Sequence, residues 1–85
     1  MPPIRYTAHA ETVLAEREID KTWVERTVRN PEWREPNPGG DLAVERRFRS
    51  VPERGGRFLR VVCVETGQEI RILSAFLDRR ARKPR

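Results

Sequence analysis

The chain has 85 residues, of which 36% are hydrophobic and 36% charged, and its formal net charge is +5. A chain of this length forms one small domain, which buries roughly 60–65% of its unfolded surface. Its single cysteine excludes an internal disulfide, and no apolar run is long enough to span a membrane. Because the amino terminus lacks the apolar region of a signal peptide, we expect a cytoplasmic protein without membrane contacts.

The positive charge is concentrated at the carboxyl end of the sequence. Five of the 18 basic residues lie within residues 79–85, and the others balance the 13 acidic residues. We therefore expect one α+β domain over residues 1–78, followed by a basic tail over residues 79–85. Such a tail either binds nucleic acid non-specifically or is a solvated chain end.

The first third of the sequence predicts a short edge strand at residues 4–6 and then two helices. Thr7 is a suitable N-cap for the first helix, which is rich in helix-forming residues and ends near Glu18. Asp20 is a suitable N-cap for the second helix, which ends before Pro31 because proline disfavours helical backbone in the preceding residue. The two helices are predicted to form a hairpin with almost no connecting loop.

The middle of the sequence predicts a loop and a strand. Residues 31–41 contain three prolines and two glycines, which is typical of a loop, and Trp33 either anchors that loop or is an exposed binding residue. Residues 42–51 form an extended segment with alternating side chains. Val44 and Phe48 point to one face of it, and the other face carries Glu45, Arg47 and Arg49.

The stretch from residue 57 to residue 78 is the most apolar part of the chain and predicts a β-hairpin. Phe58–Glu65 and Gln68–Leu77 are rich in β-branched residues, and Thr66-Gly67 separates them. We expect Gly67 to supply the positive φ of the reversal. Residues 52–56 predict a turn that joins this hairpin to the preceding strand.

These elements predict a two-layer α+β fold. An N-terminal helical hairpin packs on one face of a three- to four-stranded antiparallel sheet. The other face is either solvated or forms a binding surface, and the arginines of the strands make it suitable for a polyanion.

No strong catalytic motif is present. The sequence lacks a glycine-rich phosphate loop and the Cys/His spacing of a metal site, so we expect no metal and no cofactor. His9 is the natural general acid or base, because histidine titrates nearest to neutral pH, although it could simply cap or pack. Tyr6 could donate a hydrogen bond to a phosphate or lie at the edge of the core.

Arg60 is the most informative arginine, since it lies in the most apolar stretch of the chain. A charge in such surroundings must be paired, because an unpaired buried charge is very costly. Arg60 therefore pairs with Asp78 or Glu45, or it presents its guanidinium to a phosphate. In the latter case the predicted substrate-binding residues are Arg47, Arg49 and Arg79, although a solvated strand face is the default interpretation of Arg47 and Arg49.

The order and spacing of several short motifs resemble a family of small bacterial domains of unknown function. In that family a His-Ala helix, an Arg-Gly-Ile helix junction and an Arg-Val-Val strand recur. Here Glu18 replaces the junction glycine, and Val13 replaces a basic residue. The motifs that carry the resemblance are His9-Ala10, Arg17 with Ile19, Asn30-Pro31-Glu32, Leu59-Arg60-Val61-Val62 and Phe76-Leu77-Asp78-Arg79.

Such domains look like the RelE/ParE/BrnT group of toxin-like folds. The resemblance implies a metal-independent endoribonuclease of a toxin–antitoxin system, with RNA or the ribosome as target and an antitoxin protein as partner. For that reaction we assign His9 as general acid or base and Arg60 as phosphate ligand, with Tyr6 as a weaker candidate. The alternatives are a non-catalytic RNA- or protein-binding domain of the same fold and a small structural or regulatory module.

Overall fold

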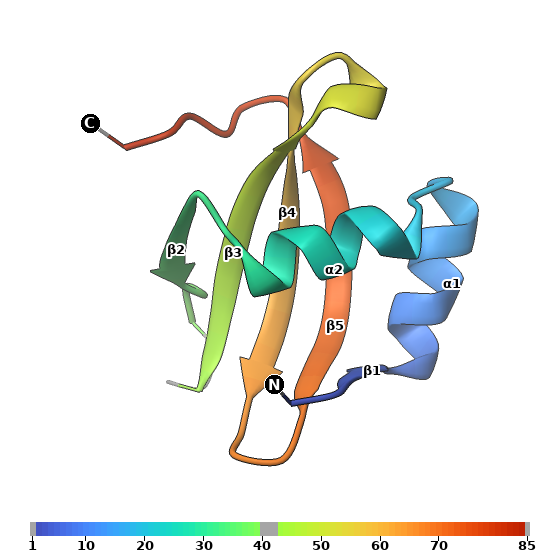
Figure 1. The fold of residues 1–85 in the computed structure, drawn as a ribbon, viewed down its shortest axis with the longest axis vertical. Coiled ribbons are helices and arrows are strands. Elements are labelled where there is room, and N and C mark those ends of the chain that lie inside the picture. The colour runs from blue at the N-terminus through green and yellow to red at the C-terminus, as the bar shows by residue number, and fades with distance from the viewer. Residues whose placement is uncertain (1, 40–42, 85) are drawn as a thin grey trace.

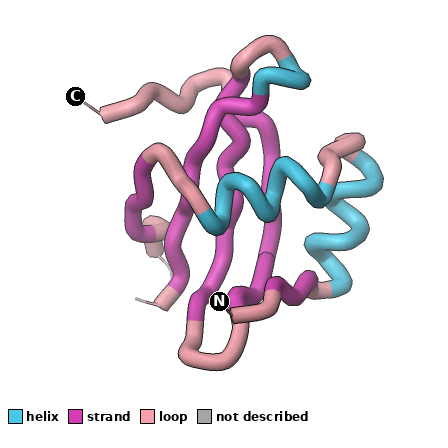
Figure 2. The backbone as a smooth tube through the Cα atoms, in the orientation of Figure 1, coloured by secondary structure: helices cyan, strands magenta, loops and turns pink. Residues whose placement is uncertain are grey.

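A computed structural model describes residues 2–39 and 43–84 of the chain, and Figures 1 and 2 show its fold. Two helices precede most of a five-stranded sheet, and a short 3-10 helix, η1, interrupts the strands. In chain order the elements are β1 (Ile4–Tyr6), α1 (Ala8–Glu16), α2 (Lys21–Arg29), β2 (Trp33–Pro36), β3 (Val44–Val51), η1 (Pro52–Arg54), β4 (Arg57–Glu65) and β5 (Ile70–Asp78).

The α+β class is confirmed, but the sheet differs from the prediction of three to four antiparallel strands. It has five strands in the order β1-β5-β4-β3-β2, and β1 runs parallel to β5. A parallel pair needs a long crossover connection, which the chain from α1 through β4 supplies. The amide of Ile70 donates to the carbonyl of Pro3, and the amide of Thr7 donates to that of Ile72, so both ends of β1 are attached to β5.

The fifth strand, β2, lies where a loop was predicted. Trp33 stacks on Phe48 of β3, with ring centroids 4.5 Å apart and an interplanar angle of 7°. The amide of Glu32 donates to the carbonyl of Phe48 over 2.7 Å. Pro36 is tolerated because β2 is an edge strand, where the missing amide proton faces away from the sheet. Trp33 is therefore an anchor for this segment, which was one of its two predicted roles.

Both helices begin at the predicted N-cap residues. The Thr7 hydroxyl accepts a hydrogen bond from the amide of Ala10, and the Asp20 carboxylate accepts one from the amide of Thr22. The second helix ends at Asn30, directly before Pro31. The helices contact different strands, since α1 packs on β5 and β1 whereas α2 packs on β3 and β4 (Figure 1).

The predicted hairpin forms from β4 and β5, but its turn differs from the expectation. Gly67 is not among the glycines with positive φ. Instead the Thr66 hydroxyl accepts hydrogen bonds from the amides of Gln68 and Glu69 and stabilises the reversal. Among the described residues other than glycine, Glu18 has left-handed backbone, with a φ of 54°. Glu18 follows Arg17, the C-cap of α1, at the position where the resemblance leads us to expect glycine.

The helices cover one face of the sheet. Its core includes Leu59, Val61 and Cys63 of β4, which alternate with the side chains of the opposite face. The register places Arg47 beside Val61 and Arg49 beside Leu59, so both arginines belong to the helix-covered face. The prediction that they line the open face is therefore wrong. The open face is instead occupied by an aromatic row that includes Trp33, Phe48, Phe58 and Phe76.

Candidate anion-binding site

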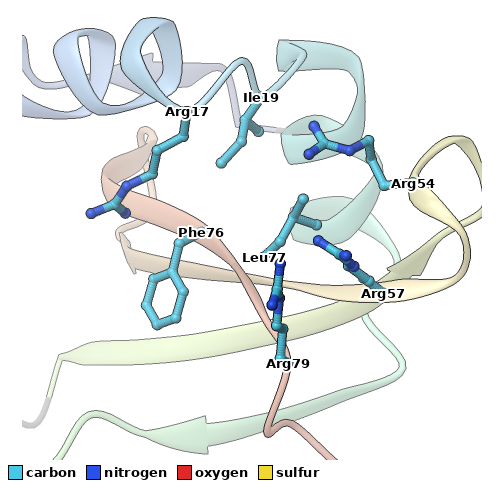
Figure 3. Close-up of a pocket in the computed structure, with 7 residues that line it drawn as sticks. All are labelled: Arg17, Ile19, Arg54, Arg57, Phe76, Leu77 and Arg79. Carbon is cyan, nitrogen blue, oxygen red and sulfur yellow. The ribbon is translucent and has the colours of Figure 1, made fainter.

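A pocket of about 430 Å³ lies at one end of the sheet, and we call it the arginine pocket. Its lining combines four guanidinium groups with an apolar wall and contains no acidic side chain (Figure 3). The lining residues are Arg17, Ile19, Arg54, Arg57, Phe76, Leu77 and Arg79.

The topology explains why residues so far apart in sequence meet here. In the antiparallel β4–β5 pair, Phe58 lies opposite Asp78, so the start of β4 and the end of β5 share one end of the sheet. Arg57 precedes Phe58 and Arg79 follows Asp78. The junction between α1 and α2 approaches the same end from the helix-covered side and contributes Arg17 and Ile19.

The turn between β3 and β4 positions two of the four arginines. Gly55 and Gly56 have φ values of 69° and 80°, which side chains other than glycine rarely adopt. Their amides donate to the carbonyls of Pro52 and Val51, respectively, and close the turn. Arg54 and Arg57 flank the glycine pair, so the turn holds both at the mouth of the pocket.

Two of the four guanidinium groups are held by neutral partners. Arg17 donates to the carbonyl of Ala75 over 2.9 Å, and its guanidinium carbon lies 5.6 Å from the ring centroid of Phe76. Arg54 donates to the carbonyl of Glu18 over 3.5 Å and lies over the ring of Trp23 at 5.9 Å. These contacts position the guanidinium groups and leave their charge uncompensated.

Within residues 2–39 and 43–84, none of the four pocket arginines forms an ion pair with a carboxylate. Most strand arginines outside the pocket do form such pairs, although Arg5 and Arg49 form none with the described carboxylates. The pairs are Arg34 with Glu45, Arg46 with Glu35, Arg47 with Glu45 and Glu65, Arg60 with Asp78, and Arg71 with Glu69. The pocket is therefore a local concentration of positive charge that an anion can neutralise.

Of the predicted site residues, Arg79 alone is among the described residues that line the arginine pocket. His9 is exposed on α1, which packs on the helix-covered side of the sheet, whereas Arg60 points to the opposite face. The structure thus does not bring together the imidazole and the guanidinium that we assigned to catalysis. Arg49 is also separate from the pocket, since it donates to the carbonyl of Asn30 over 2.9 Å.

Tyr6 lies in β1 with its hydroxyl buried and, among the described atoms, without a hydrogen-bond partner. Burial, with smaller contributions from Glu25 and Glu11, raises the pKa of Tyr6 to about 12. The ring packs under Lys21, whose ammonium nitrogen is 4.5 Å from the ring centroid. These surroundings fit the predicted role of a residue at the edge of the core.

Arg47 is buried, with 1% of its surface exposed, and serves the fold. Its guanidinium donates to the carbonyl of Val28 over 2.8 Å, near the end of α2, and to the carboxylates of Glu45 and Glu65 over 2.7 and 2.6 Å. Burial alone would lower the pKa of Arg47, but the hydrogen bonds to Glu65 and Glu45 outweigh it and keep this pKa above its ordinary value. Arg47 therefore connects α2 to the sheet and is not a ligand-binding residue of the pocket.

Arg60 pairs with Asp78, one of the two structural partners predicted for it, over 3.4 Å. Its guanidinium carbon lies 3.8 Å from the ring centroid of Phe76, and its Nε is buried without a hydrogen-bond partner among the described residues. Burial lowers the pKa of Arg60. Because Phe76 also lines the arginine pocket, Arg60 lies next to that pocket but on the open face of the sheet.

Sequence reasoning missed Arg17, Arg54 and Arg57. A signal for two of them was available, since Arg54 and Arg57 bracket the glycine pair of a predicted turn. The predicted hairpin also implied that Arg57 and Arg79 occupy neighbouring strand ends. The contribution of Arg17 depends on how the helix junction lies over the sheet, which no local motif specifies.

Fold and site together define a small α+β domain with a mixed sheet and a cationic pocket at one sheet end. The chain belongs to the family described as "Domain of unknown function (DUF4258)", whose match covers residues 6–76. No curated protein and no solved structure matches the chain. The expectation of a small domain of unknown function is thus confirmed, while the likeness to RelE/ParE/BrnT folds stays a prediction.

No group of three or more His, Cys, Asp or Glu side chains is arranged to hold a metal ion within residues 2–39 and 43–84. In the same part of the chain, no helix has the length and apolar character that crossing a membrane requires.

Proposed function

We propose that this domain binds RNA through the phosphate groups of the strand, with the arginine pocket as the contact site. The observation that carries the proposal is the group of four arginines without a carboxylate partner among the described residues. Guanidinium groups bind phosphate oxygens through paired hydrogen bonds, so each uncompensated arginine can contact a phosphate. In the sequence, the pocket residue Arg79 is the first of five basic residues within positions 79–85.

The pocket supports binding more strongly than cleavage. Metal-independent cleavage of RNA needs a proton acceptor for the 2′-hydroxyl and a proton donor for the leaving oxygen. The side chains that line the pocket are arginines and apolar residues, which do not exchange protons near neutral pH. The toxin-like endoribonuclease and its antitoxin partner therefore stay predictions that rest on the sequence resemblance.

The binding proposal is tested by fluorescence anisotropy with a labelled single-stranded RNA at several salt concentrations. Each phosphate contact on a single strand contributes about −0.7 to the slope of log K against log salt. Arg57→Gln or Arg79→Gln is expected to weaken binding roughly tenfold and to reduce the slope by about 0.7. Both residues are exposed, so neither substitution removes a buried contact.

Arg71→Gln is the matched control. Arg71 is an exposed strand arginine that pairs with Glu69 near the turn between β4 and β5, away from the arginine pocket. The control should keep both the affinity and the salt slope of the unaltered protein. An equal loss in all three variants would show that net charge, and not the pocket, determines binding.

The same samples decide between binding and cleavage. After incubation the RNA is separated on a denaturing gel, and we expect it to be intact. Fragmentation that Arg57→Gln abolishes would assign a ribonuclease to the arginine pocket. Fragmentation that His9→Ala abolishes and Arg57→Gln does not would support the catalytic assignment made from the sequence.

A further inference from the structure

Three of the four pocket arginines gather around one residue of the apolar wall. In Figure 3 the guanidinium groups of Arg54, Arg57 and Arg79 lie around Leu77, whereas that of Arg17 points away from them, beside Phe76. A groove that follows a nucleic-acid backbone would instead spread its cations along a path, one for each successive phosphate. The convergence indicates that one highly charged group is bound, and not a run of singly charged groups.

The charge and geometry of a terminal phosphate match this arrangement. An internal phosphodiester carries one negative charge and has two free oxygens. A phosphate monoester carries about −1.5 to −2 at pH 7 and offers three acceptor oxygens, because its second pKa is about 6. Several guanidinium forks can therefore contact one terminal phosphate at once, and no carboxylate among the lining residues competes for them.

The apolar wall accounts for the rest of the pocket. Ile19 and Leu77 give the pocket an aliphatic surface, and Phe76 adds an aromatic one. A volume of about 430 Å³ is within the range of small-molecule sites and is larger than a phosphate alone requires. The additional space, lined by apolar side chains, suits the sugar and base of the nucleotide that carries the phosphate.

From these observations we infer that the arginine pocket recognises the terminal phosphate monoester of an RNA strand, together with its terminal nucleoside. This inference rests on the proposed RNA binding and specifies which part of the RNA the pocket selects. The 5′-phosphate and the 3′-phosphate share the same chemistry, so the experiment includes both.

The test uses one single-stranded oligouridylate in three forms, with a 5′-phosphate, with a 3′-phosphate, or with hydroxyl groups at both ends. Each competes with a labelled RNA for the full chain in an anisotropy assay at physiological salt. We expect one of the phosphorylated forms to bind about tenfold more tightly than the hydroxyl form. The preference should decrease below pH 6, where the terminal phosphate loses its second charge.

The variants locate the preference. It should be lost in Arg57→Gln and Arg79→Gln and kept in Arg71→Gln. Equal binding of all three oligonucleotides would overturn the inference and leave the proposed RNA binding in place, whereas failure of all three to bind would overturn the proposed function itself. A preference that persists in Arg57→Gln and Arg79→Gln would also overturn the inference, because the phosphate would then be bound outside the arginine pocket.

Discussion

Replacing Arg47 tests whether this arginine serves the fold or a ligand. In Arg47→Met the volume is roughly kept, but the carbonyl of Val28 and the carboxylates of Glu45 and Glu65 lose their donor. Removing one partner of a buried ion pair typically costs about 3–5 kcal/mol. The side chains of Glu45 and Glu65 are 27% and 41% exposed, so water partly replaces the lost hydrogen bonds. We therefore expect the free energy of unfolding to decrease by about 3 kcal/mol.

This loss is large for a domain of this size, whose free energy of unfolding is expected to be about 4–13 kcal/mol. It corresponds to a decrease in Tm of about 12–24 °C. Urea unfolding followed by tryptophan fluorescence measures it, because Trp23 and Trp33 are both partly buried. The slope of the free energy of unfolding against urea concentration is proportional to the surface exposed on unfolding. An unchanged slope therefore shows that the variant still unfolds from a compact state.

Arg49→Met is the matched control, since Arg49 lies two residues further along β3 on the same face. It is more exposed and donates to one carbonyl, that of Asn30. The control should lose less than about 1 kcal/mol. If the free energy of unfolding of Arg47→Met lies within about 1 kcal/mol of that of the unaltered protein, the hydrogen bonds of Arg47 do not hold α2 on the sheet. That result would refute the structural role of Arg47.

Three further predictions concern single groups. Glu18→Gly should raise the free energy of unfolding by about 0.5–1 kcal/mol in thermal melts, because glycine adopts the left-handed φ of 54° without strain, and a destabilised variant would contradict this. Burial raises the pKa of the Cys63 thiol to about 11, so a thiol reagent at pH 8 should modify Cys63 only after denaturation; rapid modification of the native protein would place the thiol at the surface. Burial raises the pKa of Tyr6, the only tyrosine, from 10.0 to about 12, so the folded state favours the neutral phenol. The free energy of unfolding should therefore decrease as the pH rises from 10 to 12. A pH titration of tyrosinate absorbance in the folded protein with a midpoint near 10 would contradict this prediction.

The helices and the long hairpin could be predicted because their signals are local. Thr7 and Asp20 cap the helices through contacts two or three residues away, and Pro31 ends the second helix by a steric effect on its neighbour. The hairpin follows from β-branched residues in two adjacent runs. Each of these features depends on a short segment and is little affected by the rest of the chain.

The elements that sequence reasoning missed depend on contacts between distant segments. Residues 33–36 have the composition of a loop, and they form a strand because Trp33 stacks on Phe48. The direction of β1 is decided by its bonds to β5, some 65 residues later in the chain. The alternation of side chains in β3 was predicted correctly, but the face that the helices cover was not. The aromatic side chains lie on the open face, and Arg47 lies under the helices because its charge is neutralised there by Glu65.

The candidate site was difficult to predict for the same reason. Arg60 was conspicuous in the sequence because it lies among apolar residues, and in the structure Asp78 and Phe76 are its partners. The arginines that form the pocket lie at element ends, where charged residues are common and carry no distinctive pattern. Their importance appears when the ends of β4 and β5, the glycine turn and the helix junction are placed together.

Mapping the RNA contact by NMR tests the central claim most directly. Amide chemical shifts are followed while a single-stranded RNA is added to the full chain. The arginine pocket predicts that the largest changes occur at Ile19, Arg57, Leu77 and Arg79. Changes that cluster around His9, with the four pocket amides unaffected, would contradict the account.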